Sequence, residues 1–254
     1  MNDKTVWRDE RVTTAQIAVA GLKLTARSLL RSPLVWIVAC VLFTGTNLVD
    51  LVYGGGSGKA LTALQIVSLA VRLFSNIWIV VVALRTFLDR RTVWALDRSF
   101  LSYVAFFIVY FGVGLGIASV VGHALSAFVG QGARAVRVTA VLSMLVAYCL
   151  LTIRIMLWPT ALALGDRSVG LRESWRRTRG ATLAMIGAFF ALLPIAAVHF
   201  GLTAWATTLP LSGDNRLIVT ICDGVLSVVQ VMLAMAFAAA MYKILGERAA
   251  QAPN

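Results

Sequence analysis

The sequence predicts an all-α membrane protein, a bundle of about six transmembrane helices accompanied by amphipathic helices at the membrane surface. Of its 254 residues, 59% are hydrophobic and only 13% are charged, and the mean hydropathy is +0.85. A soluble domain carries about 25% charged residues, and its surface needs polar cover that this composition does not supply. The length leaves room for one membrane domain, without a second soluble domain of ordinary size.

Six apolar stretches are long enough to span a membrane, because a hydrocarbon layer of about 30 Å needs about 20 helical residues. The predicted spans are residues 34–53, 61–88, 101–122, 138–164, 181–207 and 217–245. Small residues in the third and sixth spans, such as Gly112, Gly116, Ala234 and Ala238, would let helix backbones approach closely. The chain therefore divides into an N-terminal segment (residues 1–33), a six-helix transmembrane domain (34–245) and a short tail (246–254).

Basic residues alternate between the two sides of these spans. Seventeen of the 23 lysines and arginines fall in residues 1–33, 85–100, 165–180 and 243–254, which lie on one side. Four fall in the links on the other side, and two lie within spans. Because short loops rich in lysine and arginine stay in the cytoplasm, both termini are expected there. The net charge of +12 therefore indicates membrane topology, and nucleic acid is not an expected partner.

Each cytoplasmic approach to an odd-numbered span is predicted to form an amphipathic helix on the membrane surface, at residues 13–31, 92–100 and 169–179. Their basic polar faces favour membrane lipids with anionic headgroups on the cytoplasmic side. The sequence leaves open whether the chain also binds an unknown protein partner or a second copy of itself. Three such units indicate either a three-hairpin repeat or simply the positive-inside pattern.

Ionisable residues deep in a membrane are costly and mark candidate sites. Arg72 lies within the second span, Asp223 lies in the sixth, and Asp50 lies near the outer end of the first. Arginine is long enough to reach either carboxylate. An Arg72–Asp223 or Arg72–Asp50 pair would be either an ion pair that sets helix register or part of an outward-facing cavity for an anionic headgroup or solute.

Arg154 lies in the inner half of the fourth span, five residues before Pro159. Asn76 and Gln230 are expected at similar depths, where they could solvate its charge. Alternatively, Arg154 reaches the cytoplasmic headgroups near Trp158. We favour the internal role, because Pro159 leaves backbone acceptors free nearby.

Catalytic and metal-binding patterns are missing from the sequence. There is no nucleophile elbow, no His-Glu-x-x-His and no phosphate-binding loop. His123 and His199 are expected on the same outer side as Asp50 and Asp223, but no two of these share the spacing of one helical face. The three cysteines lie in apolar runs and behave as small hydrophobic residues. We therefore expect no enzyme activity, no catalytic residue, no cofactor and no metal.

One stretch resembles a known family. It reads Arg154-Ile-Met-Leu-Trp-Pro159 and continues, after a short link, as Glu173-Ser-Trp-Arg-Arg-Thr178-Arg-Gly180. This is similar to the membrane-domain family attached to some glycerophosphoryl diester phosphodiesterases, and to its stand-alone six-helix relatives of unknown function. The resemblance implies a multi-pass protein of a bacterial inner membrane. Phosphodiesterase chemistry would belong to a separate soluble domain and is not implied for this chain.

Two functions follow as hypotheses. The first is an accessory or structural membrane protein in envelope or lipid homeostasis. The alternative is a small transporter or lipid-binding protein with a polar cavity around Arg72 and Asp223. A polar pocket that reaches Arg72 would favour the alternative, and a tightly packed bundle would favour the accessory role.

Overall fold

The computed structural model describes residues 12–53, 63–90, 92–128, 147–148, 150–208 and 213–251. Within these ranges the chain is helical and contains no strand, which confirms the predicted all-α class for this part of the protein. The helices are α1 (Thr14–Arg31), α2 (Pro33–Tyr53), α3 (Ala63–Phe87), α4 (Arg98–Phe128), α6 (Leu157–Leu164), α7 (Leu171–Arg177), α8 (Thr182–Phe190), α9 (Leu193–Thr208) and α10 (Gly213–Gln251).

The described helices provide three to five candidate membrane spans. Three segments qualify by length and hydropathy on their own: Leu69–Phe87 in α3, Arg98–Ile117 in α4 and Asn215–Gln251 in α10. Two bent pairs, α1 with α2 and α8 with α9, raise the number to five if each pair is one span. The fourth predicted span, residues 138–164, lies partly outside the described residues, and its described part is interrupted at Met156.

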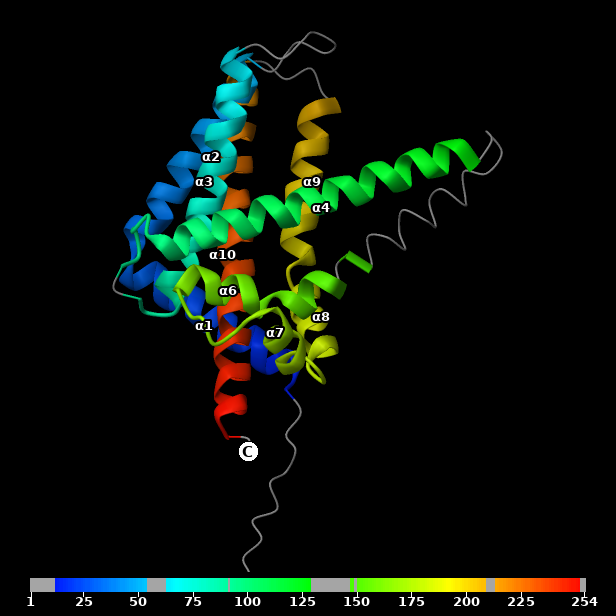
Figure 1. Ribbon diagram of the computed structural model, residues 1–254. Coiled ribbons are helices and arrows are strands. Elements are labelled where there is room, and N and C mark those ends of the chain that lie inside the picture. Colours follow the sequence, from blue (N-terminus) through cyan, green and yellow to red (C-terminus); the bar gives the residue numbers. More distant parts are fainter. Residues whose placement is uncertain are drawn as a thin grey trace, which may run out of the picture.

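Helix α10 is the centre of the fold, and α1, α2, α3, α6, α7, α8 and α9 all contact it (Figure 1). It is buried on two faces. Val228, Met232, Ala236 and Ala239 repeat at helical spacing and face a core shared with α2 and α3. A second stripe lies on another face of α10 and packs in a core with α1, α6 and α8; its members are Leu233, Phe237, Met241 and Leu245.

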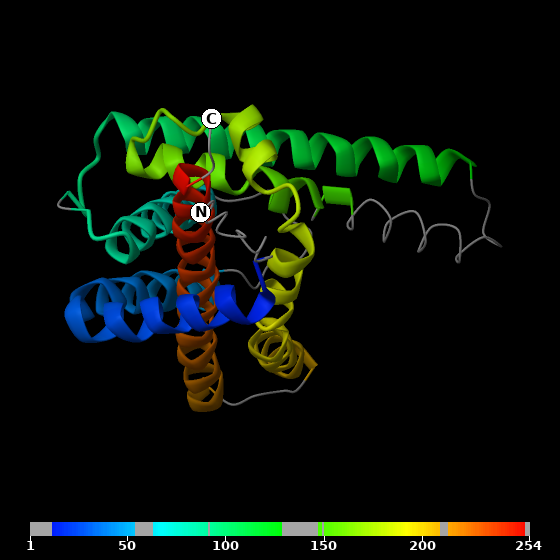
Figure 2. The same ribbon diagram turned by 90° about the horizontal axis from the view of Figure 1, so that it is seen from below.

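Helices α1, α6 and α7 surround the C-terminal half of α10 (Figures 1 and 2). We call this end of the bundle the basic end, because the last turns of four helices bring arginines there. These arginines are Arg31, Arg85, Arg176, Arg177 and Arg248. The basic segments of the sequence are thus neighbours in space.

Helix α1 meets α2 at an angle of 94°. Its start is fixed by a capping box, in which the Gln16 backbone N–H donates to Thr13 Oγ1 and the Gln16 side chain accepts from the Thr13 N–H. Ser32 stands before Pro33 and leaves the helical region, as a residue before proline prefers to do. The Trp36 Nε1–H donates to Ser28 Oγ (3.1 Å) across this corner. The right angle is the geometry expected of a surface helix that leads into a span.

Close helix packing occurs in α10, and of the predicted glycines Gly112, Gly114 and Gly116 of the third span only Gly114 is closely packed, since a Cβ there would lie 3.0 Å from the Tyr148 hydroxyl. A Cβ added at Gly224 would lie 2.8 Å from the Thr44 Cα, so α2 and α10 touch backbone to backbone there. A Cβ at Gly112 or Gly116 would meet nothing within 4 Å. Ala238, in contrast, is buried as the small-residue pattern predicted.

Helix α4 crosses the other helices and extends beyond them (Figures 1 and 2). It is held at one end by aromatic contacts: Phe106 lies edge-on to Trp158 (5.1 Å between ring centroids) and Tyr110 stacks on Tyr148 (5.1 Å). Further along, Val109 and Val113 are exposed. Such a surface suits a lipid solvent, in which apolar side chains need no protein cover.

The prediction of a surface helix at residues 92–100 is wrong. Residues 92–97 form a turn and an extended segment, and α4 begins only at Arg98. The other two predicted surface segments do contain helices, α1 and α7. The proposed three-hairpin repeat therefore lacks its surface helix in the second unit.

Candidate functional sites

Asn47 of α2 joins two of the predicted site residues. Its Nδ2 donates to Asp223 Oδ2 of α10 (2.8 Å), and its Oδ1 accepts from the Arg72 guanidinium of α3 (3.1 Å). A side-chain amide can bridge a cation and an anion in this way because it carries both a donor and an acceptor. The sequence reasoning placed Arg72 near Asp223 but missed Asn47, which is only 9% exposed.

His199 of α9 extends this network to a fourth helix. Its Nε2 lies 3.0 Å from Asp223 Oδ1 and 3.3 Å from Ser227 Oγ, and its Nδ1 lies 2.9 Å from Gln230 Oε1. In a catalytic serine–histidine–aspartate triad the serine and the aspartate use opposite ring nitrogens. Here both lie at the same nitrogen, so the arrangement does not match such a triad.

These residues form a network, here called the intramembrane network because they all lie in candidate spans, and it ties together α2, α3, α9 and α10. Hydrogen bonds between side chains stabilise helix association where the surroundings offer no water. The side chains of Asp50 and His123 lie outside the described residues. In the part of the chain that the structure describes, no three histidine, cysteine, aspartate or glutamate side chains cluster as a metal site would require.

Arg154 points toward α7 and not toward its predicted partners. Its guanidinium donates to the Trp175 carbonyl (2.9 Å) and to Thr182 Oγ1 (3.2 Å), and it lies 4.5 Å from the centre of the Trp175 ring. The predicted contact with Gln230 is wrong, because Gln230 binds His199 instead. The side chain of Asn76, the other predicted partner, makes no hydrogen bond to the described residues.

The backbone of Arg154 completes the same cluster. Its carbonyl accepts from Ser174 Oγ (3.0 Å) and from Thr178 Oγ1 (3.1 Å). Pro159 has no N–H for the helix, and the helix is interrupted at Met156, so carbonyls near the break need other donors. Ser174 and Thr178 are fully buried. The residues that carry the family resemblance therefore form one joint between α7 and the chain before α6.

Arg85 at the end of α3 is the most completely bonded arginine of the described chain, with 2% of its side chain exposed. All five of its N–H donors can be matched to acceptors. Three acceptors are backbone carbonyls, at Ala163 (2.9 Å), Thr92 (3.1 Å) and Ala95 (2.5 Å). The other two are Asp97 Oδ1 and Ser99 Oγ, each 2.6 Å away. Because these bonds hold residues 92–97 in an extended turn, no helix forms there.

Asp97 serves both Arg85 and the start of α4. Its Oδ1 also accepts from the Phe100 backbone N–H (3.0 Å), which caps the helix. Burial raises the pKa of Asp97, but the hydrogen bonds from Phe100, Ser99 and Arg85 outweigh this effect and hold it below its usual value. The carboxylate therefore remains ionised beside Arg85.

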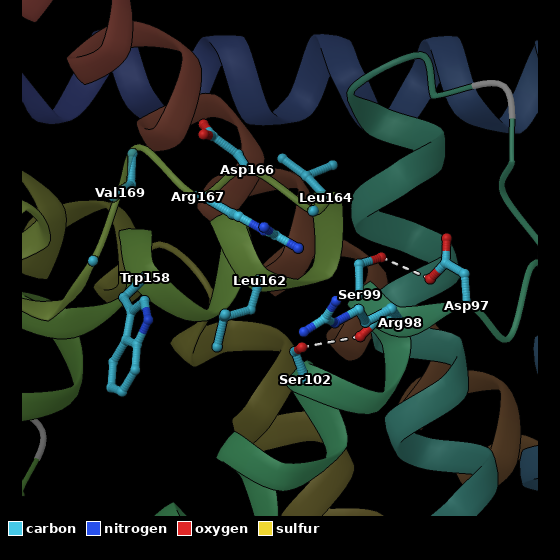
Figure 3. Close-up of a pocket in the computed structure, with 12 residues that line it drawn as sticks. Asp97, Arg98, Ser99, Ser102, Trp158, Leu162, Leu164, Asp166, Arg167 and Val169 are labelled. Atoms are coloured by element: carbon cyan, nitrogen blue, oxygen red, sulfur yellow. Dashed lines mark hydrogen bonds between the residues drawn. The ribbon is translucent and has the colours of Figure 1, made fainter.

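A pocket of about 550 Å³ opens beside this cluster, between the start of α4 and the α6–α7 link (Figure 3). Charged, hydroxyl and apolar side chains line it, among them Asp97, Arg98, Ser102, Trp158, Leu162, Asp166 and Arg167. Asp166 accepts from the Tyr242 hydroxyl and from the Ser168 N–H (2.8 Å). Burial raises the pKa of Asp166, but these hydrogen bonds outweigh it and keep the pKa low.

The sequence reasoning treated Arg85, Arg98 and Arg167 only as positive charges that set topology. The sequence contains one signal of a buried charge, at Arg85. This residue directly continues an apolar run, where a charge needs partners. Nothing in the spacing of Arg98 and Arg167, 69 positions apart in the numbering, indicates that they line one pocket.

Replacing Arg85 by glutamine should strongly destabilise the protein. The change removes the guanidinium donors from three carbonyls and from the Asp97 carboxylate, and breaking a buried ion pair costs about 3–5 kcal/mol. Thermal unfolding of the purified protein in detergent measures the effect. Arg90→Gln is the control, since Arg90 is exposed. Equal melting temperatures for the two variants would contradict the central role of Arg85.

Asp97→Asn should lower stability by the same amount at pH 8 and at pH 5. The folded pKa of Asp97 is depressed, so its contribution is fully present above the ordinary pKa of about 3.9 and is lost only as the pH falls through the lower folded value. Thermal unfolding of wild type and variant at both pH values tests this. A gap that widens at pH 5 would contradict the prediction, because it would show that the folded pKa of Asp97 is raised above its usual value.

No protein-family model, curated protein or solved structure matches this chain.

Proposed function

We propose that the protein is a multi-pass bacterial inner-membrane protein without catalytic activity, with an accessory role in envelope or lipid homeostasis. The observation that carries this proposal is the bridge of Asn47 between Arg72 and Asp223. Polar side chains that bind one another across four helices fix the register of these helices. They then have fewer hydrogen-bonding groups left to bind a solute. In this proposal the intramembrane network is structural.

The alternative is a transporter or lipid-binding protein with a cavity around Arg72 and Asp223. Against it, the Asn47 amide that separates the two charges is buried, and the pocket of Figure 3 lies at the basic end instead. His199, which the alternative would also use, already contacts Asp223, Ser227 and Gln230. The accessory role therefore has the better support.

Six spans with both termini in the cytoplasm are part of the proposal. The alternation of basic segments supports this topology. The grouping of arginines at the basic end and the 94° bend between α1 and α2 support a cytoplasmic surface that contacts anionic lipid headgroups. The contacts of Arg154 with Ser174 and Thr178 give a structural role to the motif that resembles the phosphodiesterase-associated membrane domains.

Cysteine labelling in whole cells should test the topology. In a variant whose three native cysteines are replaced by alanine, we expect Ser57→Cys and Gln131→Cys to react with a membrane-impermeant thiol reagent from outside. Ser168→Cys and Asn254→Cys should react only after the membrane is opened. Outside labelling at position 168 would overturn the six-span topology.

Asn47→Ala should lower the melting temperature, because the Arg72 and Asp223 groups lose their shared partner. Losing a hydrogen bond to a charged group costs about 1.5–3 kcal/mol. Asn76→Ala is a matched control, since this second asparagine of the apolar helices makes no hydrogen bond to a described residue. The proposal predicts a clear loss for Asn47→Ala and little change for Asn76→Ala.

Activity assays on the same purified proteins separate the two functions. The accessory role predicts no solute uptake into proteoliposomes and no hydrolysis of glycerophosphodiesters. If Asn47→Ala kept wild-type stability but abolished a measurable uptake, the cavity hypothesis would replace the proposal. Turnover of a phosphodiester by the wild-type protein would overturn the assignment as a non-enzyme.

A further inference from the structure

Two arginines whose side chains lack partners among the described residues converge on the pocket at the basic end. Arg98 stands at the start of α4 and Arg167 in the α6–α7 link, and Figure 3 shows both guanidinium groups directed toward the space between these elements. Neither side chain makes a hydrogen bond or an ion pair with the described residues. Two like charges that line one pocket repel each other, and this repulsion favours a bound anion.

The carboxylates of the same pocket do not supply that anion. Asp97 is bound by Arg85, Ser99 and the Phe100 N–H, and Asp166 is bound by Tyr242 and Ser168. Arg85 balances the charge of Asp97. The Asp166 carboxylate is ionised and its two partners are neutral, so it offsets one of the two guanidinium charges. The pocket therefore keeps a surplus of one positive charge.

The opposite wall of the pocket is apolar. Trp158 and Leu162 form it, and the Trp158 ring is held edge-on against Phe106 of α4. Tryptophan is typical of the boundary between headgroups and acyl chains. A pocket with cations on one wall and an indole with a leucine on the other fits an amphiphile better than a free inorganic anion. Its volume of about 550 Å³ is within the range of about 300–1,000 Å³ for small-molecule sites.

We propose that this pocket binds the phosphate of an anionic phospholipid from the cytoplasmic leaflet. Arg98 and Arg167 hold the phosphate oxygens, for which planar guanidinium groups are well suited. Trp158 and Leu162 contact the glycerol and the first carbons of the acyl chains. The inference rests on the proposed lipid-related accessory role and gives it a defined site.

The test compares two double variants that remove the same charge. Arg98→Gln with Arg167→Gln alters the pocket. Arg172→Gln with Arg179→Gln alters two exposed arginines on and beside α7 that also lack partners among the described residues. Arg176 and Arg177 are unsuitable as controls because both are paired with Glu173.

Purified full-length proteins are titrated with phosphatidylglycerol in phosphatidylcholine nanodiscs, and bound lipid is counted by native mass spectrometry. We expect the pocket variant to bind phosphatidylglycerol at least about tenfold more weakly than wild type, since two charge-assisted contacts are lost. The control variant should change it by less than about twofold, as screened surface charges contribute little. Equal weakening in both variants would mean a diffuse basic surface and would overturn the site.

Glycerol phosphate and inorganic phosphate distinguish the two sources of this chemistry. If millimolar glycerol phosphate displaces no phosphatidylglycerol, the acyl-chain contacts contribute as proposed. If inorganic phosphate alone raises the melting temperature as much as phosphatidylglycerol does, the pocket is a site for a soluble anion and the lipid assignment fails.

Folding and function are checked separately. Because the side chains of Arg98 and Arg167 make no hydrogen bond or ion pair with the described residues, the pocket variant should keep the wild-type melting temperature in detergent without anionic lipid. Failure of the lipid site would appear as unchanged phosphatidylglycerol binding in that folded variant. Failure of the accessory function would appear instead as uptake or hydrolysis by the wild-type protein, so the two outcomes remain distinct.

Discussion

The buried guanidinium of Arg85 is the interaction on which the basic end depends. A single charge with five donors gathers the turn before α4, the cap of α4 and the end of α6 around the last turn of α3. A cation so thoroughly removed from solvent is tolerated only when every donor is matched and a carboxylate offsets its charge. The same bonds engage Asp97, which forms its ion pair with Arg85 and not with Arg98. The pocket lies beside this cluster, and the Arg98 side chain that lines it has no partner among the described residues.

Three arginines within apolar segments of the chain offset their charge with different partners. Arg72 is joined to its carboxylate through the amide of Asn47. Arg85 combines a carboxylate with backbone carbonyls, whereas Arg154 uses an aromatic ring, a carbonyl and a hydroxyl. Each arrangement joins elements that are distant in the sequence. Arg98 and Arg167 differ from all three, since their side chains are exposed and have no partner in the described part of the chain, which suits a ligand site.

Sequence reasoning located the deep charges but not their partners. Asp223 and Arg72 were placed near one another because both depths could be counted along apolar runs. Asn47 was missed because a neutral amide within an apolar run carries no signal of depth or pairing. Gln230 was assigned to Arg154 from depth alone, yet it lies on the side of α10 that faces His199. Depth is one coordinate, and rotation about the helix axis decides which side chains meet.

Composition and the alternation of basic segments determined by themselves that this chain is helical and rich in segments able to span a membrane. Those properties follow from the transfer free energy of side chains and from the need to satisfy backbone hydrogen bonds within each segment. Only the tertiary structure decided that residues 92–97 are not helical, because the competing acceptors of Arg85 come from α6 and from the turn itself. It also decided that Arg98 and Arg167 share one pocket. Both outcomes depend on helix packing, which a local pattern of apolar residues does not specify.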